Sequence, residues 1–140
     1  MALITGSSQG IGLALARGLA QAGATAVLNG RDPQRLAAAT ATLAAAGLTV
    51  HRRAFGSADA VAVQEAVASI EARIGPIDIL INNAGIALRG LVHDIPASTW
   101  HAVQRTHVDG LFVCGQAVAQ RMVARSHRQH LLGDERTGAP

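Results

Sequence analysis

Three glycines near the start of the chain have a spacing that suits phosphate binding. They lie in the run Thr5–Gly12, which follows a short apolar segment, Ala2–Ile4, and precedes a helical pattern that begins at Leu13. Glycine lets the backbone turn tightly and lets a pyrophosphate approach, and the first N–H groups of the following helix point at its charge. The order of strand, glycine-rich turn and helix therefore predicts a phosphate-binding site; an ordinary strand–helix turn is the alternative.

The rest of the chain alternates between apolar segments and helical patterns. We predict strands at residues 2–4, 25–29, 48–52 and 77–81. We predict helices at residues 13–20, 33–46, 60–74 and 97–125, and we allow for a kink in the last one near 107–110. Such alternation is typical of an α/β fold with a doubly wound parallel sheet. Right-handed crossovers and the reversal of strand order place the first strand beside the fourth, so that residues 82–85 lie over the glycine turn.

Two of the predicted helices have start signals. Asp32 is expected to cap the second helix, with Pro33 in its first turn. Asp59 or Ser57 is expected to cap the third helix. Apolar residues at helical spacing predict the face of that helix that turns toward the core: Val63, Val67 and Ile70.

A second motif, Asn82-Asn83-Ala84-Gly85, follows the fourth predicted strand. Together with Thr5-Gly6-x-x-x-Gly10-Ile11-Gly12 it resembles the sequence motifs of the short-chain dehydrogenase/reductase family. Residues 1–125 carry the resemblance, and residues 28–32 are similar in particular to the gluconate 5-dehydrogenase-like branch. The resemblance implies the N-terminal part of a Rossmann-type NAD(P)-binding domain. It also implies an oxidoreductase that transfers hydride between a nicotinamide cofactor and a hydroxyl or carbonyl substrate, such as a sugar acid.

The resemblance assigns positions to the cofactor. The glycine turn would hold the pyrophosphate through Gly6, Ser8, Gln9, Gly10, Ile11 and Gly12, and the adenine ribose would be lined by Asn83, Ala84 and Gly85. At the end of the second strand Gly30 stands where an acidic residue would bind the ribose and repel a 2′-phosphate, and Arg31 follows it. We therefore expect NADP(H) to be preferred. NAD(H) is the alternative, because Gln9 is not the basic residue common in NADP-preferring relatives. Gly56 stands where the family usually has an aspartate near the adenine, so that contact is expected to be absent.

The family's catalytic groups are missing from the sequence. The resemblance implies a Ser-Tyr-Lys arrangement supported by an Asn, in which tyrosine is the acid–base and lysine lowers the tyrosine pKa. The chain has no tyrosine, and its 12 Lys+Arg residues are all arginines. His107 stands at the Asn position; it is either a substitute in a proton relay or, as we favour, a tolerated polar residue. We expect no catalytic residues and an inactive chain, and the alternative function is a non-catalytic dinucleotide-binding or subunit-interaction module.

Composition indicates the cellular location of the protein and the kinds of molecule it binds. Hydrophobic residues make up 49% of the 140 residues, but no apolar run is long enough to span a membrane, so we expect a cytoplasmic protein without a membrane partner. The single cysteine, Cys114, can form no internal disulfide. The formal charge is +3, but the arginines form no stripe with interleaved aromatics, so we expect neither nucleic acid nor metal as a partner. The helix after Trp100 matches the segment that pairs between subunits in the family, which allows for a homo-oligomer.

The C-terminal segment differs from the family. Residues 126–140 lose the apolar pattern, and we expect an irregular tail outside the domain. Codons for residues 127–140 exist that, read one base later, encode a segment resembling the family's fifth strand and serine segment. One hypothesis is therefore a frameshifted, truncated fragment, and a genuine divergent tail is the alternative. Without a further strand, residues 77–81 would form an apolar, uncovered sheet edge, and marginal stability is expected.

Overall fold

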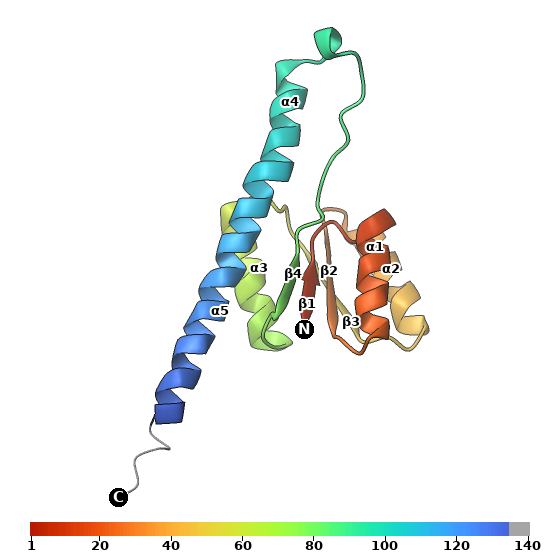
Figure 1. Ribbon diagram of the computed structural model, residues 1–140. Helices are drawn as coiled ribbons and strands as arrows, with labels where there is room; N and C mark the ends of the chain where they lie inside the picture. The colour runs from red at the N-terminus through yellow and green to blue at the C-terminus, as the bar shows by residue number, and fades with distance from the viewer. Residues whose placement is uncertain (135–140) are drawn as a thin grey trace, which may run out of the picture.

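The computed structural model describes the backbone of residues 1–134 and the side chains of residues 1–126. Its centre is a parallel sheet with the strand order β3-β2-β1-β4 (Figure 1). The strands are β1 (Ala2–Ile4), β2 (Ala26–Gly30), β3 (Val50–Ala54) and β4 (Ile79–Ile81). The predicted α/β fold is confirmed, and the first strand lies beside the fourth as expected.

Helices cover both faces of this sheet (Figure 1). One face carries α1 (Gly10–Gln21) and α2 (Pro33–Ala45), and the other carries α3 (Ala60–Arg73) and α5 (Gly110–Asp134). α1 begins earlier than predicted, since its first turn already includes the last glycines of the motif. Each pair of helices buries its own aliphatic cluster against the sheet.

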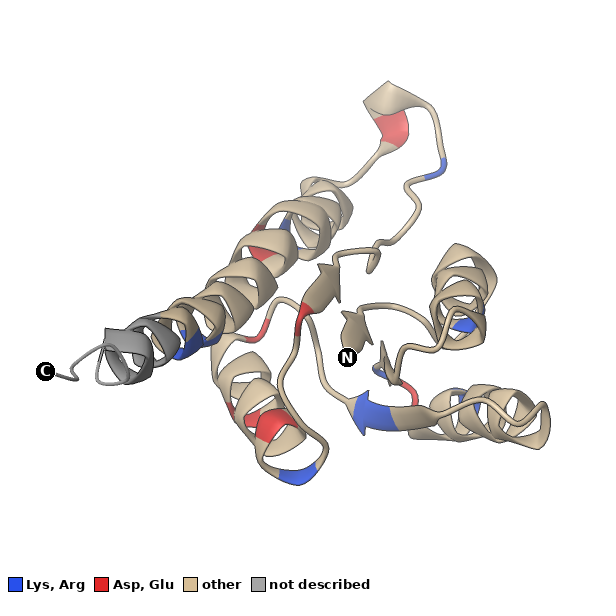
Figure 2. Ribbon diagram, turned by 60° about the horizontal axis from the view of Figure 1, so that its bottom comes forward, with Lys and Arg blue, Asp and Glu red and all other residues tan. Residues whose placement is uncertain are grey.

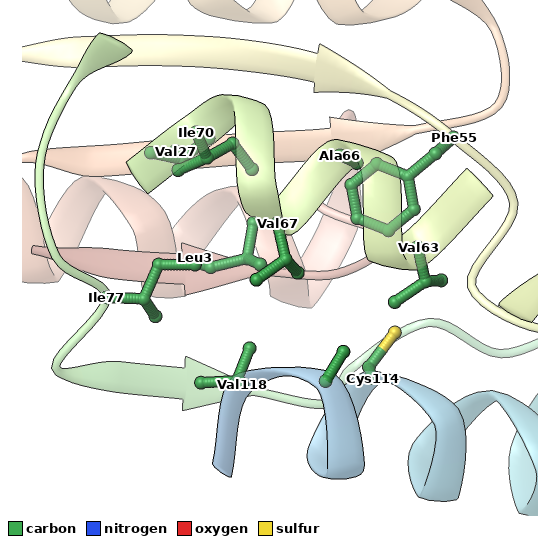
Figure 3. Close-up of a cluster of buried hydrophobic side chains, with 11 residues drawn as sticks. Leu3, Val27, Phe55, Val63, Ala66, Val67, Ile70, Ile77, Cys114 and Val118 are labelled. Atoms are coloured by element: carbon green, nitrogen blue, oxygen red, sulfur yellow. The ribbon is translucent and has the colours of Figure 1, made fainter. Parts of the chain in front are cut away.

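The cluster beneath α3 and α5 contains the face predicted for α3 (Figure 3). Val63, Val67 and Ile70 are buried beside Leu3 of β1. α5 completes the cluster with three buried residues: Cys114, Ala117 and Val118. The helical spacing in the sequence thus predicted correctly which side of α3 faces the sheet.

Side-chain caps fix the starts of α2 and α3. Asp32 Oδ1 accepts the N–H of Arg35 at 3.1 Å, as expected for the cap of α2. Asp59 Oδ1 accepts the N–H of Ala62 at 3.0 Å, so Asp59 and not Ser57 caps α3. These bonds satisfy helix N–H groups that lack an intrahelical partner.

The start of β3 lies later in the chain than predicted. β3 begins at Val50 instead of residue 48, because the N–H of Leu48 closes the end of α2 by donating to the Leu43 carbonyl at 3.3 Å. Gly47, with φ +76°, allows the chain to reverse there. An apolar residue after the helix was therefore misread as the first residue of a strand.

The start of β4 is also displaced. β4 begins at Ile79, because two side chains form hydrogen bonds with the backbone of Ile77. Glu71 accepts its N–H at 3.1 Å and Arg125 donates to its carbonyl at 2.6 Å. Backbone groups engaged in this way are not available to a strand ladder. β4 lies at the edge of the sheet as expected, but it is only partly uncovered. Leu80 packs against the cluster under α5, although Ile79 remains 43% exposed.

A long helical rod crosses the molecule after a loop with a single short turn, η1 (Val92–Asp94) (Figure 1). The rod consists of α4 (Ala97–Gln104), the π-helical turn η2 (Arg105–Asp109) and α5. The π-helical turn overlaps the stretch 107–110, where the sequence allowed for a kink. The predicted end at residue 125 and the irregular tail need correction: the backbone is helical to residue 134, and residues 135–140 lie outside the described part. Within residues 1–134, no helix is long and apolar enough to cross a membrane.

Candidate functional site

The glycine turn joins β1 to α1, and two of its glycines have a left-handed backbone. Gly6 has φ +62° and Gly10 has φ +58°. Gly6 is also closely packed, since a Cβ there would lie 2.7 Å from Ala84 Cα. Gly12 is buried in the first turn of α1, where a Cβ would lie 2.6 Å from the Gly6 carbonyl oxygen. Only glycine fits at these positions, so the turn can bring backbone N–H groups close to an anion.

Buried polar groups hold the turn from below. Ser7 Oγ donates to the Ile4 carbonyl at 2.8 Å and accepts the N–H of Asn29 at 2.9 Å. Asn29 Oδ1 accepts the N–H of Gly6 at 3.2 Å, and its amide donates to the Phe55 carbonyl at 3.0 Å. The ends of β1, β2 and β3 are thereby tied to one another. Sequence reasoning assigned no role to either side chain; for Asn29 the signal was a polar residue at the end of an otherwise apolar strand pattern.

A second set of hydrogen bonds joins the glycine turn to the segment after β4. Thr5 Oγ1 accepts the N–H groups of Asn83 and Ala84, both at 3.0 Å. The Asn83 amide donates to the carbonyls of Thr5 and Gly6, both at 3.0 Å. The two sequence motifs therefore lie together, as the strand order predicted. Thr5 was not singled out as a functional residue from the sequence, yet its hydroxyl is the centre of this contact.

An open cleft of about 710 Å³ lies above these contacts. Its size falls in the range of small-molecule sites. Every residue predicted to bind cofactor lines it: Gly6, Ser8, Gln9, Gly10, Ile11, Gly12, Arg31, Asn83, Ala84 and Gly85. Gly56 also lines the cleft and offers no side chain where the family usually has an aspartate.

The end of β2 forms the outer wall of the cleft. A Cβ on Gly30 would lie 3.2 Å from Ser8 Oγ, so even a small side chain there would crowd the turn. Arg31 follows and is exposed. The Asp32 carboxylate is engaged in capping α2 and lies 3.3 Å from Arg35 Nε. The wall therefore presents two guanidinium groups and one carboxylate, whose oxygens already interact with the start of α2 and with Arg35.

Positive charge is spread widely over the rest of the molecule (Figure 2). Arginines lie on several helices and on β3, and they are interspersed with acidic positions. Between α3 and α5, Glu71 is shared by Arg121 and Arg125. Local positive charge at the cleft thus comes from Arg31 and Arg35 in its wall, with Arg105 at its far side.

His107 lies in the π-helical turn η2, where it lines a small hollow that shares Asn83 and Ala84 with the cleft. Its Nε2 is 3.1 Å from the nitrogen and 3.0 Å from the carbonyl oxygen of Ile86. The ring also lies against Gly85, where a Cβ would be 3.0 Å from Nε2. His107 therefore contacts the backbone of the segment after β4, a role that neither sequence interpretation included.

Neither the cysteine thiol nor the possible metal ligands of the described residues form a reactive centre. Burial raises the pKa of the Cys114 thiol to about 11, so it is a poor nucleophile near neutral pH. Within the described residues, no cluster of three His, Cys, Asp or Glu side chains could hold a metal ion. The site is equipped to bind an extended, phosphate-bearing ligand by backbone N–H groups, an amide and guanidinium groups.

Comparison with known proteins defines the class. The family model for short chain dehydrogenase matches residues 1–129, and the chain belongs to this family. Gluconate 5-dehydrogenase from Gluconobacter oxydans is 47% identical over 124 residues, which cover 89% of this chain and 48% of that protein. The chain thus spans about half the length of the curated relatives that it matches.

Solved structures agree with this membership. A gluconate 5-dehydrogenase from Burkholderia cenocepacia, in complex with NADP and tartrate, superposes with a TM-score of 0.83 at 45% identity, covering 89% of this chain and 49% of the other. A metagenomic short-chain oxidoreductase in complex with NADP gives a TM-score of 0.81 at 32% identity, covering 89% of this chain and 57% of the other. The predicted resemblance to the family and to its gluconate 5-dehydrogenase-like members is confirmed.

Proposed function

We propose that this chain forms the dinucleotide-binding half of an NAD(P)-dependent short-chain oxidoreductase and that it prefers NADP(H). The observation that carries the proposal is the cleft itself, which collects all the residues predicted to bind cofactor. Gly6, Gly10 and Gly12 leave room for the pyrophosphate, and the start of α1 directs N–H groups toward it. Residues 1–125 would then be an incomplete NAD(P)-binding domain, with residues 126–140 outside the family's sequence pattern.

The preference for NADP(H) rests on the wall after β2. Gly30 leaves no acid to repel a 2′-phosphate, and the carboxylate of Asp32 is turned into the cap of α2. Arg31 is exposed beside this space and can supply a charge-assisted hydrogen bond. Relatives solved with NADP are consistent with the preference. NAD(H) remains the competing cofactor, since Gln9 brings no positive charge to the turn.

Titration of NADPH and NADH against the purified chain, followed by cofactor fluorescence, tests this proposal. We expect Arg31→Ser to weaken NADPH binding by about tenfold and to leave NADH binding nearly unchanged. The matched control is Arg17→Ser, because Arg17 is an exposed arginine of α1 that does not line the cleft. Equal affinity of the wild-type chain for both cofactors would refute the preference, and binding of neither would refute the site.

The reaction we propose for the complete enzyme class is hydride transfer between the nicotinamide and a hydroxyl or carbonyl substrate, with a sugar acid as the substrate class. These 140 residues contain no tyrosine and no lysine, so the acid–base pair of the family is absent from them. We therefore expect no turnover by this chain alone. Steady-state NADPH oxidation across carbonyl substrates checks this, and activity above that of a boiled sample would contradict it.

A second candidate function is subunit interaction, and an exposed apolar stripe on the helical rod favours it. The stripe consists of Trp100, Val108, Leu111, Phe112 and Val123, all at least half exposed. A homo-oligomer would cover it. Light scattering after size exclusion tests this: Phe112→Glu should shift an oligomer toward monomer, whereas Val61→Glu, at an exposed position on α3, should not. A monomeric wild-type chain would exclude the homo-oligomer.

We further propose a cytoplasmic location and a frameshifted tail. Whether the chain is a fragment and whether its tail is frameshifted both depend on the coding DNA around and beyond the codon for Arg125. A downstream frame that encodes Tyr-x-x-x-Lys would support a frameshift. A frame without that segment would favour a genuine divergent tail.

A further inference from the structure

The segment after β4, residues 83–90, is held by different partners at its two ends. Thr5 Oγ1 accepts the N–H groups of Asn83 and Ala84. Beyond these, within the described side chains, the hydrogen bonds that tie residues 85–90 to the rest of the molecule come from His107 alone. The position of Ile86, which lines the cleft, therefore depends on one imidazole.

The His107 ring meets both backbone groups of Ile86 with the same nitrogen. Nε2 lies 3.1 Å from the Ile86 nitrogen and 3.0 Å from its carbonyl oxygen. A bare Nε2 accepts a hydrogen bond from the N–H, whereas a protonated Nε2 donates to the carbonyl and opposes the N–H. The two contacts thus belong to different protonation or tautomeric states of the ring, and only one of them is a hydrogen bond at a time.

Close packing keeps the ring at this junction. A Cβ on Gly85 would lie 3.0 Å from Nε2 and 3.3 Å from Nδ1 of His107. Glycine at position 85 is what allows the imidazole to reach Ile86. A hollow of about 130 Å³ lies beside the junction, and the His107 ring is part of its lining.

We propose that His107 is a positioning residue that holds Ile86 by its N–H when the imidazole is neutral with a bare Nε2, and by its carbonyl when the imidazole is charged. Dinucleotide affinity then changes with pH. The pH dependence of dinucleotide affinity rests on the proposed cofactor site, whereas the contact between His107 and Ile86 concerns the cofactor-free chain. Histidine changes its charge between about pH 5 and pH 8. The charged ring makes the stronger, charge-assisted bond to the segment that lines the cleft, so affinity rises as the pH falls.

Few other titratable groups face the ring. The elements around it present uncharged residues to the small hollow: Thr5, Ser57, Asn82, Asn83 and Leu111. Arg105 and Asp109 flank His107 in η2. The opposite wall of the main cleft carries four charged residues: Arg31, Asp32, Arg35 and Asp59.

Nuclear magnetic resonance of the cofactor-free chain tests the contact directly. As the pH falls from about 8 to about 6, the Ile86 amide signal should shift together with the ring nitrogens of His107. In His107→Asn the amide should not titrate, since an Asn amide carries donor and acceptor at once. His101→Asn is the matched control: His101 lies on α4, is exposed and lines no hollow near Ile86, so the titration should persist. An Ile86 amide that ignores the His107 titration overturns the proposal, whether or not cofactor binds.

Calorimetric titration with NADP⁺ at the same pH values tests the consequence. The 2′-phosphate of the ligand titrates identically for every variant, so only the difference between variants belongs to His107. We expect wild-type affinity to rise by about threefold more than that of His107→Asn on acidification. Equal pH profiles overturn the effect on affinity. If NADP⁺ binds to no variant while the Ile86 amide titrates, the contact stands and the proposed cofactor site fails. His107→Gln, which keeps an amide on a longer chain, repeats the comparison if His107→Asn does not fold.

Discussion

The two walls of the cleft are built in different ways. The wall formed by the glycine turn rests on buried side chains, with Ser7 and Asn29 almost inaccessible and bonded to several backbone groups. The wall that follows Gly85 is exposed and is held by His107. The first wall is preorganised for phosphate, while the second can adjust without loss of core packing. The difference indicates that binding of the diphosphate is built into the core, whereas the region beyond it depends on a few surface contacts.

Loss of space in the first wall should have the largest effect. We expect Gly12→Val to destabilise the chain by about 3 kcal/mol or more and to abolish dinucleotide binding, because its Cβ would overlap the Gly6 carbonyl and Ser7 Cα. Urea unfolding and NADPH titration measure both effects. Gly18→Ala is the control: a Cβ at Gly18 of α1 meets no atom within 4 Å, so this change should stabilise by about 0.5–1 kcal/mol. Similar losses in both variants would contradict the picture of a tightly packed turn.

The thiol in the cluster beneath α3 and α5 should be slow to react. Cys114 is buried with its Sγ directed at the Ser57 carbonyl, and burial raises its pKa to about 11. We expect alkylation by iodoacetamide near pH 8 to be about a hundredfold slower in the native chain than in urea, since the thiolate reacts. The native rate should increase as the pH rises toward 11. Equal rates in the native and unfolded chains would show that α5 opens readily from the sheet.

The junction between the walls should respond to loss of a hydroxyl. We expect Thr5→Val to destabilise by about 1–3 kcal/mol and to weaken NADPH binding, because the N–H groups of Asn83 and Ala84 lose their acceptor. Thermal unfolding and cofactor titration measure these changes. Thr42→Val, at an exposed position of α2, removes a hydroxyl that bonds only within the helix and should change stability by less than about 0.5 kcal/mol. A neutral Thr5→Val would mean that the two motifs are held together by other contacts.

The loop that continues from the second wall should tolerate change. Val92 lies in η1 of this loop and is 90% exposed, so we expect Val92→Ser to alter the unfolding free energy by less than about 0.5 kcal/mol. Urea unfolding beside the wild-type chain provides the measurement. A loss of more than about 1 kcal/mol would show that this loop is closely packed and would weaken the contrast with the glycine turn.

Local sequence signals determined most of the architecture. Helical spacing identified the buried face of α3, and Asp32 with Pro33 marked the start of α2. The two glycine-containing motifs, each at the end of a strand, indicated the cleft and its lining residues. These features are readable because strand and helix periods, caps and turns depend on residues within a few positions of one another.

Tertiary structure decided what the sequence pattern could not show. The first residue of β4 depends on Glu71 and Arg125, which bind the backbone of Ile77 from two helices. The backbone of Ile86 is contacted by His107, 21 positions away in the chain, and Thr5 is joined to Asn83 across 78 positions. Such contacts carry no local period, because packing of the helices on the sheet brings their atoms within hydrogen-bonding distance. The sequence by itself determined the elements, the family and the lining of the cleft, and the packed structure determined which side chains hold that lining in place.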